Sequence, residues 1–176
     1  PATRPPPSKN SVLIGFMGSG KSTLGAKLAR RIGYEYSDMD QLIVDTAEMS
    51  IPAIFREHGE EVFRKWEQDI LAELCHREKL VISTGGGAPC HSQMMDLMNT
   101  HGTTIYIQLS PEALKDRLIR SKTERPLIKG KSETELLDFI KTLLKEREFF
   151  YKQARHIVDG ISLKAEDLAR LLEFPA

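Results

Sequence analysis

The sequence GFMGSGKS at residues 15–22 constrains the fold more than any other segment of the chain. It matches the pattern G-x-x-x-x-G-K-[ST], and it lies between an apolar run at 11–14 and a stretch at 21–32 with helical periodicity. Glycines let successive backbone N–H groups turn inward, and the amino end of the helix adds partial positive charge. A glycine-rich turn before a helix is the alternative. The motif predicts a strand, a phosphate-binding loop and a helix, and therefore a site for a nucleoside triphosphate.

Each residue type in this loop has a chemical reason to be there. Lys21 can reach the β- and γ-phosphates of a bound nucleotide, and the Ser22 hydroxyl can ligate Mg²⁺. Lys21 is therefore predicted to be catalytic, with Mg²⁺ as the cofactor. The residues expected to contact the nucleotide phosphates are Gly18, Ser19, Gly20, Lys21, Ser22 and Thr23.

Short apolar runs alternate with long amphipathic stretches along the rest of the chain. Strands are expected at 34–37, 80–83, 104–108 and 156–159, and helices at 42–49, 52–58, 60–77, 92–99, 111–120, 133–154 and 165–172. Ser110 is predicted to cap the helix that begins at Pro111. Strands that alternate with helices predict an α/β architecture, in which a parallel sheet is covered on both faces.

The length of 176 residues favours one domain. Residues 1–10 contain four of the nine prolines, so they are expected to form a flexible tail, a processed end or an expression remnant. Residues 11–176 are expected to form the single domain. Within it, residues 121–131 are polar and charged, which predicts a mobile surface lid.

The composition excludes several classes of protein. Lysine plus arginine and aspartate plus glutamate both number 25, and a nucleic-acid binder would normally show a basic excess. Two cysteines, Cys75 and Cys90, are too few for a disulfide framework and lack zinc-site spacing. No apolar run reaches the length of a membrane span. A cytoplasmic enzyme with no nucleic-acid or membrane partner is therefore expected. The protein is also expected to be a monomer.

Two further segments follow predicted strands at the edge where α/β sheets bind ligands. Asp38 and Asp40 stand at alternate positions after the second strand, so one carboxylate could face a metal and the other an acceptor hydroxyl. Capping of the helix near Gln41 is the alternative for either. The glycines at 85–87 follow the third strand and could donate N–H groups to a small ligand, unless they form only a flexible turn.

Taken together, these residues resemble the shikimate kinase family. The matching segments span about residues 12–172 and are 15–23, 38–40, 59–64 with Glu67, 85–87, 125–127 and Arg147. The resemblance implies transfer of the γ-phosphate of ATP to the 3-hydroxyl of shikimate, a step toward chorismate and the aromatic amino acids. It also implies a three-layer α/β/α P-loop fold, with a five-stranded parallel sheet in the order 2-3-1-4-5 and a lid.

The resemblance also implies roles for individual residues. Asp40 is expected to contact the acceptor hydroxyls as the catalytic base, and Asp38 to act beside Ser22 toward Mg²⁺. The catalytic residues are thus Lys21, Asp40 and the lid arginine Arg125, which also belongs to the nucleotide site. Shikimate is expected to be held by Asp40, Arg64, Gly86, Gly87 and Arg147, because two arginines suit a carboxylate.

Some features leave alternatives open. Residues 159–164 lack the arginine and proline often found where the family wraps the adenine. Arg117 is the residue expected to stack on that base, and the nearby Arg120 is the alternative. Another small-molecule kinase of the same architecture, such as a gluconate kinase or a nucleoside monophosphate kinase, is the nearest alternative. A non-catalytic nucleotide-binding regulator is a second, although it would not need Lys21, Asp40 and Arg125 together.

Overall fold

The computed structural model describes residues 10–122 and 125–174. Its centre is a parallel sheet of five strands in the order β2-β3-β1-β4-β5. These strands are β1 (Asn10–Ile14), β2 (Glu35–Asp38), β3 (Leu80–Ser83), β4 (Thr103–Gln108) and β5 (His156–Asp159). The predicted sheet and its strand order are confirmed.

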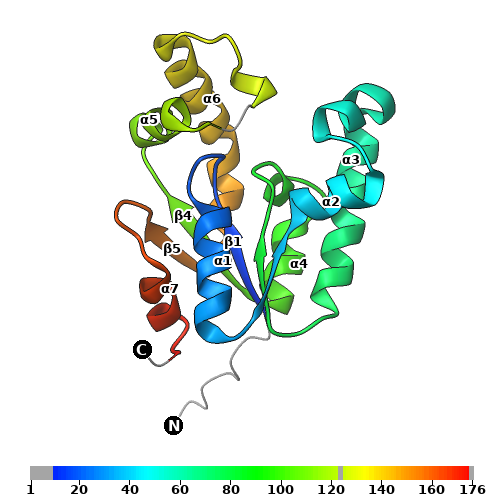
Figure 1. The fold of residues 1–176 in the computed structure, drawn as a ribbon, viewed down its shortest axis with the longest axis vertical. Helices are drawn as coiled ribbons and strands as arrows, with labels where there is room; N and C mark the ends of the chain where they lie inside the picture. The colour runs from blue at the N-terminus through cyan, green and yellow to red at the C-terminus, as the bar shows by residue number, and fades with distance from the viewer. Residues whose placement is uncertain (1–9, 123–124, 175–176) are drawn as a thin grey trace.

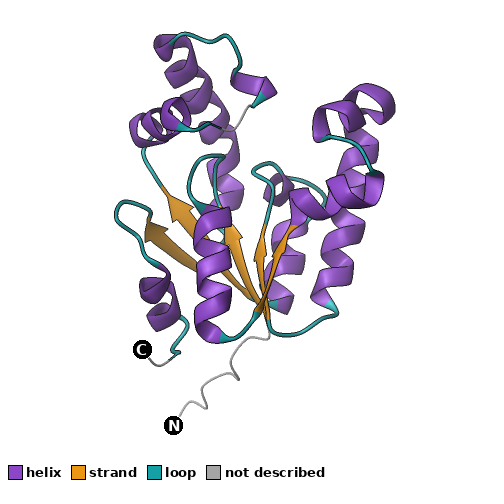
Figure 2. Cartoon of the chain, viewed as in Figure 1, coloured by secondary structure: helices purple, strands orange, loops and turns teal. Residues whose placement is uncertain are grey.

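Helices cover both faces of this sheet (Figures 1 and 2). In chain order they are α1 (Lys21–Ile32), α2 (Met39–Ala47), α3 (Ile51–Cys75), α4 (Met94–His101), α5 (Pro111–Arg120), α6 (Glu133–Tyr151) and α7 (Ala165–Leu171). Short 3-10 helices at Ala88–Cys90 and Pro126–Ile128 complete the described elements.

The burial pattern of β1 explains the three layers. Side chains alternate across a strand, so Val12 and Ile14 pack toward α3, α4 and α6 on one face. Leu13 points the other way and packs with Leu28 of α1 and Leu168 of α7. Because both faces are covered, the central strands read as continuous apolar runs, which is how the sequence revealed them.

Several element boundaries differ from the prediction. Helix α2 begins at Met39 because the Asp38 side chain accepts a hydrogen bond from the backbone of Gln41. Helix α4 begins at Met94 because Ser92 and Gln93 both have positive φ angles. Helix α6 ends at Tyr151, three residues early, and neither 3-10 helix was predicted.

The two helices predicted at 52–58 and 60–77 are continuous except for a kink at Gly59. This residue has φ 85° and ψ 167°, a backbone conformation in the left-handed half of the map that glycine adopts without a steric penalty. Both parts of α3 pack with α2 around Ile43, Ile54 and Phe63, which form a small core separate from the sheet. The later part of α3 also packs against the sheet, so this helix contributes to both cores.

The chain ends and the lid lie partly outside the described residues. Residues 1–9 of the predicted tail are not described, while Asn10 is the first residue of β1 and is buried. Its side chain bonds the backbone of Leu80 and Arg77, so it belongs to the domain. In the lid segment at 121–131, residues 123 and 124 are not described, and the rest contains the 3-10 helix.

Figure 1 shows how this fold positions the functional segments. The loop between β1 and α1 lies above the carboxyl ends of the strands. Helix α2 and the first part of α3 stand on one side of this loop, and α5 with the beginning of α6 stands on the other. Ligands bind at this edge in open α/β sheets. None of the helices among the described residues is both long and apolar enough to cross a membrane.

Candidate active site

The loop between β1 and α1 has the conformation that its glycines predict. Gly18 and Gly20 have φ angles of 81° and 97°, which side-chain-bearing residues rarely adopt. The ammonium of Lys21 is buried within the loop and donates to the carbonyls of Gly15 (2.6 Å) and Phe16 (3.1 Å). Ser22 and Thr23 are exposed on the first turn of α1. The loop thus encloses one cation and opens toward solvent at the helix end.

Lys21 is also the meeting point of charged groups from distant parts of the chain. Burial lowers the pKa of Lys21 to about 8, against the opposing effect of the Asp40 carboxylate. The guanidinium groups of Arg125 and Arg147 also lower this pKa, because they carry the same charge. Tertiary structure therefore gathers the carboxylates of Asp40 and Asp38 and the guanidinium groups of Arg125 and Arg147 around Lys21.

The two predicted carboxylates have different surroundings. Asp38, at the end of β2, accepts hydrogen bonds from the Ser22 hydroxyl (3.1 Å) and from the backbone N–H of Gln41 (3.2 Å). It therefore caps α2 and also lies beside the phosphate loop, so the two alternatives left open by the sequence are compatible. Asp40 is on the first turn of α2, and burial, followed by the charge of Asp38, raises its pKa.

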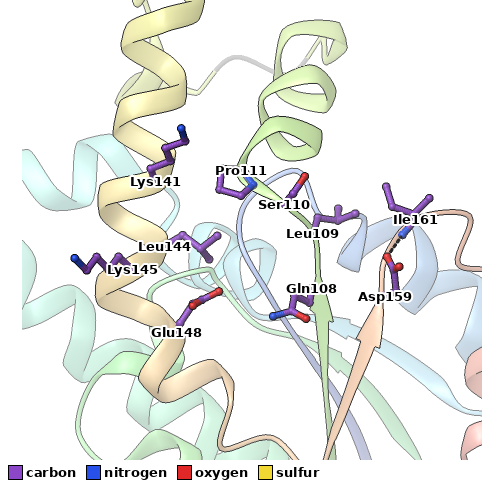
Figure 3. Close-up of a pocket in the computed structure, with 10 residues that line it drawn as sticks. All are labelled: Gln108, Leu109, Ser110, Pro111, Lys141, Leu144, Lys145, Glu148, Asp159 and Ile161. Carbon is purple, nitrogen blue, oxygen red and sulfur yellow. Dashed lines mark hydrogen bonds between the residues drawn. The ribbon is translucent and has the colours of Figure 1, made fainter.

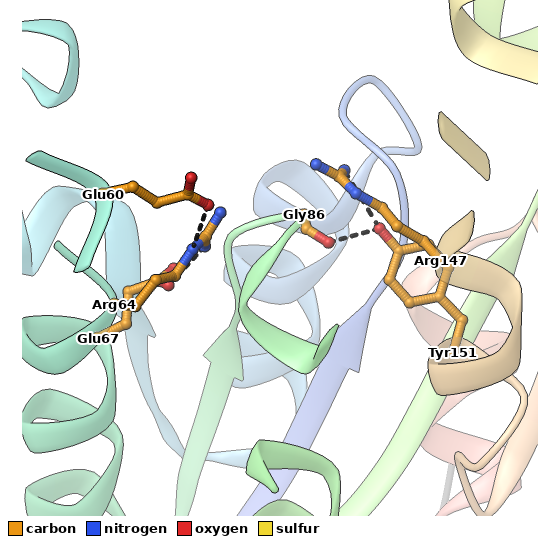
Figure 4. A network of polar contacts seen from close by, with 6 residues as sticks. All are labelled: Glu60, Arg64, Glu67, Gly86, Arg147 and Tyr151. Carbon is orange, nitrogen blue, oxygen red and sulfur yellow. Dashed lines mark hydrogen bonds and ion pairs between the residues drawn. The ribbon is translucent and has the colours of Figure 1, made fainter. Parts of the chain in front are cut away.

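The glycine segment after β3 passes between the two predicted arginines (Figure 4). A Cβ atom on Gly86 would lie 3.0 Å from Arg147 Nη1, and one on Gly87 would lie 2.8 Å from Arg64 Nη2. A Cβ atom on Gly85 would lie 2.7 Å from Asp40 Oδ1. The absence of side chains here is what allows three charged groups to approach the backbone, so the segment is more than a flexible turn.

The environment of Arg64 includes an acid for which the sequence predicts no role. Glu67 is almost fully buried and accepts a hydrogen bond from Arg64 Nη1 at 2.6 Å, while Glu60 lies 3.5 Å from Arg64 Nε. Burial raises the pKa of Glu67 to about 6, although the charge of Arg64 opposes this shift. The sequence signal that could have indicated this role is a glutamate one turn after an arginine, on the apolar face of α3.

Arg117 and Arg125 lie on the other side of the loop. The guanidinium of Arg117 donates to the carbonyls of Ser19 (3.3 Å) and Gly160 (3.1 Å), so it spans the space between the phosphate loop and the segment after β5. Arg125 is half-buried, and its Nε is buried with no hydrogen-bond partner among the described residues. The lid segment turns Arg125 toward Asp40. Burial lowers the pKa of Arg125, and the charge of Asp40 opposes this shift.

A cavity of about 550 Å³ lies outside this cluster (Figure 3). It opens between α6 and the ends of β4 and β5, where Lys145, Glu148 and Asp159 are among the residues that line it. None of the predicted site residues lines it. The predicted residues instead gather at the phosphate loop.

Comparison with known proteins identifies the family. The family model described as shikimate kinase matches residues 17–174. The chain belongs to the shikimate kinase family. A shikimate kinase from Bacteroides fragilis is 43% identical over 145 residues, covering 82% of this chain and 81% of that protein. One from Azobacteroides pseudotrichonymphae is 47% identical over 143 residues, covering 81% of this chain and 84% of that protein.

Solved structures of the family have the same fold. The shikimate kinase from Bacteroides thetaiotaomicron aligns with a TM-score of 0.90 and 37% identity, covering 94% of this chain and 99% of that one. A shikimate kinase from Acinetobacter baumannii, solved in complex with shikimate, aligns with a TM-score of 0.80 and 33% identity, covering 94% and 90%. A gluconokinase from Sinorhizobium meliloti, at 17% identity and a TM-score of 0.57, shares the fold alone.

Shikimate kinases use ATP as co-substrate. The electrostatics of Lys21 predict how the use of ATP by this protein depends on pH. Because burial lowers the pKa of Lys21 to about 8, the free protein loses this positive charge as the pH rises through that value. We expect kcat/KM for ATP, which reports the free enzyme, to fall above about pH 8. The bound triphosphate favours the ammonium, so kcat should fall only at higher pH. Rate profiles at constant ionic strength test this, and a kcat/KM that stays flat into the ordinary lysine range would contradict it.

Proposed function

We infer that this protein phosphorylates shikimate, transferring the γ-phosphoryl group of ATP to the 3-hydroxyl and releasing ADP. The observation that carries this inference is the pair of guanidinium groups, Arg64 and Arg147, on either side of Gly86 and Gly87. Arg64 lies near Asp40, and both Asp40 and Arg147 lie near Lys21 of the phosphate loop. A carboxylate-binding region and a phosphate-binding region are therefore adjacent.

This arrangement suits a small acid with ring hydroxyls. Guanidinium groups bind carboxylates through two parallel N–H···O bonds, so Arg64 and Arg147 can hold the acceptor carboxylate. The backbone N–H groups of Gly86 and Gly87 can donate to the same ligand. With the carboxylate held there, a ring hydroxyl would face Asp40. A gluconate or nucleotide acceptor is not favoured by the comparisons.

Asp40 is proposed as the base for this hydroxyl. As the acceptor oxygen forms its bond to the γ-phosphorus, the bond from that phosphorus to the bridging oxygen breaks and ADP leaves. The hydroxyl proton passes to the Asp40 carboxylate. Burial raises the pKa of Asp40, which makes it a stronger base than an exposed aspartate.

The phosphate end of the site is proposed to combine protein and metal charges. Ser22 and Asp38 offer a hydroxyl and a carboxylate, and Mg²⁺ is commonly held by one or two such groups together with nucleotide phosphates and water. When bound there, Mg²⁺ would neutralise phosphate charge. Lys21 would hold the β- and γ-phosphates. Arg117, whose guanidinium donates to the Gly160 carbonyl, would contact the adenine.

The enzyme is further proposed to work as a monomer. The residues assigned to ATP and shikimate all come from one chain, so no second copy is required to complete the site. Sedimentation of the purified protein, with and without both substrates, tests this point.

The function is tested by ADP release in a coupled assay with a panel of acceptors. The panel should contain shikimate, gluconate and nucleoside monophosphates, together with a control without acceptor. Shikimate-dependent ADP release, with shikimate 3-phosphate identified as the product, would support the proposal. Equal turnover of gluconate, or ADP release that is independent of any acceptor, would refute it.

Replacing Arg125 with alanine tests the proposed lid. The buried Nε of Arg125 has no hydrogen-bond partner among the described residues and could donate to a phosphate oxygen, so we expect kcat to fall by about 100-fold or more, as for loss of one preorganised donor. KM for ATP should change little, because an interaction made mainly in the transition state affects turnover more than binding. Lys129→Ala is the control, because Lys129 is an exposed cation in the same segment. A large rise in KM for ATP at unchanged kcat would instead make Arg125 a ground-state clamp.

A further inference from the structure

Tyr151 is a buried polar residue next to the acceptor region that the proposed mechanism does not use. It is the last residue of α6, one turn after Arg147, and its ring packs on Tyr106 of β4 with centroids 5.0 Å apart. Its side chain is fully buried. Its hydroxyl contacts both the Gly86 carbonyl and, at 3.5 Å, Arg147 Nη1 (Figure 4). One hydroxyl thus connects two groups assigned to the acceptor.

The chemistry of the three groups determines the direction of both hydrogen bonds. A carbonyl can only accept and a guanidinium can only donate, whereas a phenol has one hydrogen and lone pairs on oxygen. The Tyr151 hydroxyl must therefore donate to Gly86 and accept from Arg147. Burial raises the pKa of Tyr151 to about 12, so the phenol keeps the proton that this arrangement requires.

The surroundings of Arg147 leave its charge available for a ligand. The guanidinium lies 5.5 Å from the centroid of the Phe16 ring in the phosphate loop, and it lies so close to Gly86 that a Cβ atom there would be 3.0 Å from Nη1. Tyr151 adds a third contact, which is neutral. Arg64, by contrast, is paired with the carboxylate of Glu67. A neutral partner can orient a guanidinium without cancelling the charge that attracts an anion.

We propose that Tyr151 is a positioning residue for the acceptor carboxylate. By linking the Gly86 carbonyl to Arg147, its hydroxyl holds the glycine segment and the guanidinium in one relative position before the acceptor binds. The acceptor then meets two groups that are already oriented, which lowers the entropic cost of binding. This inference rests on the proposed function.

The variant Tyr151→Phe removes only the hydroxyl oxygen and tests the role directly. We expect KM and the dissociation constant for shikimate to rise by roughly tenfold, as for loss of one hydrogen bond to a charged group. KM for ATP should not change, and kcat should change much less than KM for shikimate. Tyr106→Phe, which removes a hydroxyl from the ring that packs on Tyr151, is the matched control and should leave all four values unchanged.

A double-variant comparison separates positioning from a general effect on stability. If Tyr151 acts through Arg147, Tyr151→Phe should raise KM for shikimate much less in the Arg147→Lys protein than in the wild-type protein. An unchanged KM for shikimate in Tyr151→Phe would overturn the proposal. So would an equal loss for both substrates accompanied by a lower melting temperature, since that indicates a structural role. Failure of the proposed function would appear differently, as absence of shikimate turnover in the wild-type protein.

Discussion

Replacing Lys21 with alanine should reduce kcat by at least about 100-fold. The ammonium is the buried cation at the centre of the phosphate loop, and in phosphoryl transfer it would neutralise charge on the β- and γ-phosphates. Steady-state kinetics with saturating shikimate measure the effect. KM for ATP should also rise, because the bound triphosphate loses the same contact.

Lys27→Ala is the control for this variant, since Lys27 is an exposed lysine on the same helix. It should retain wild-type kcat. The melting temperature of both variants should be recorded, because Lys21 also holds the carbonyls of Gly15 and Phe16. Near-normal turnover in a folded Lys21→Ala protein would contradict the assignment of residues 15–22 as the phosphate site.

Replacing Asp40 with asparagine should reduce kcat by about 10²- to 10⁴-fold, the usual contribution of a positioned base. Asparagine keeps the shape of the side chain beside Gly85 but can neither carry the negative charge nor accept the hydroxyl proton. ATP binding, measured by calorimetry without acceptor, should change little. Steady-state kinetics with shikimate provide the test.

Asp45→Asn is the matched control, because Asp45 is an exposed aspartate on the same helix α2. It should leave kcat unchanged. If Asp40→Asn turned over shikimate at the wild-type rate, Asp40 would not be the base. Asp38 is unchanged in the Asp40→Asn variant and can still cap α2 and contact Ser22. A fall in kcat in this variant would therefore be due to Asp40.

Local chemistry explains which parts of the fold were predictable. The strands that were found most accurately, β1, β3, β4 and β5, are apolar runs bounded by polar or glycine residues. The boundaries that were wrong depend on local backbone conformation, as at the positive φ angles of Ser92 and Gln93. Neither residue type predicts such a conformation, so pattern alone could not place the start of α4.

The amino-acid sequence by itself determined the phosphate loop and the α/β class. Both depend on neighbours in the chain: glycines whose backbone can turn, an apolar strand before them and a helix after them. Resemblance to a family added the strand order, and Arg64 and Arg147 as expected site residues, whereas Asp40 was already indicated by its place after the second strand. These residues are far apart in the chain, so their own sequence surroundings do not show that they meet.

Only the tertiary structure decided how those distant residues come together. It placed Tyr151 against Gly86, and it turned Arg125 toward Asp40. The physical reason is that burial and charge act through space. The pKa values of Lys21 and Glu67 depend on groups brought close by packing of the helices against the sheet, and no local pattern in the sequence contains that information.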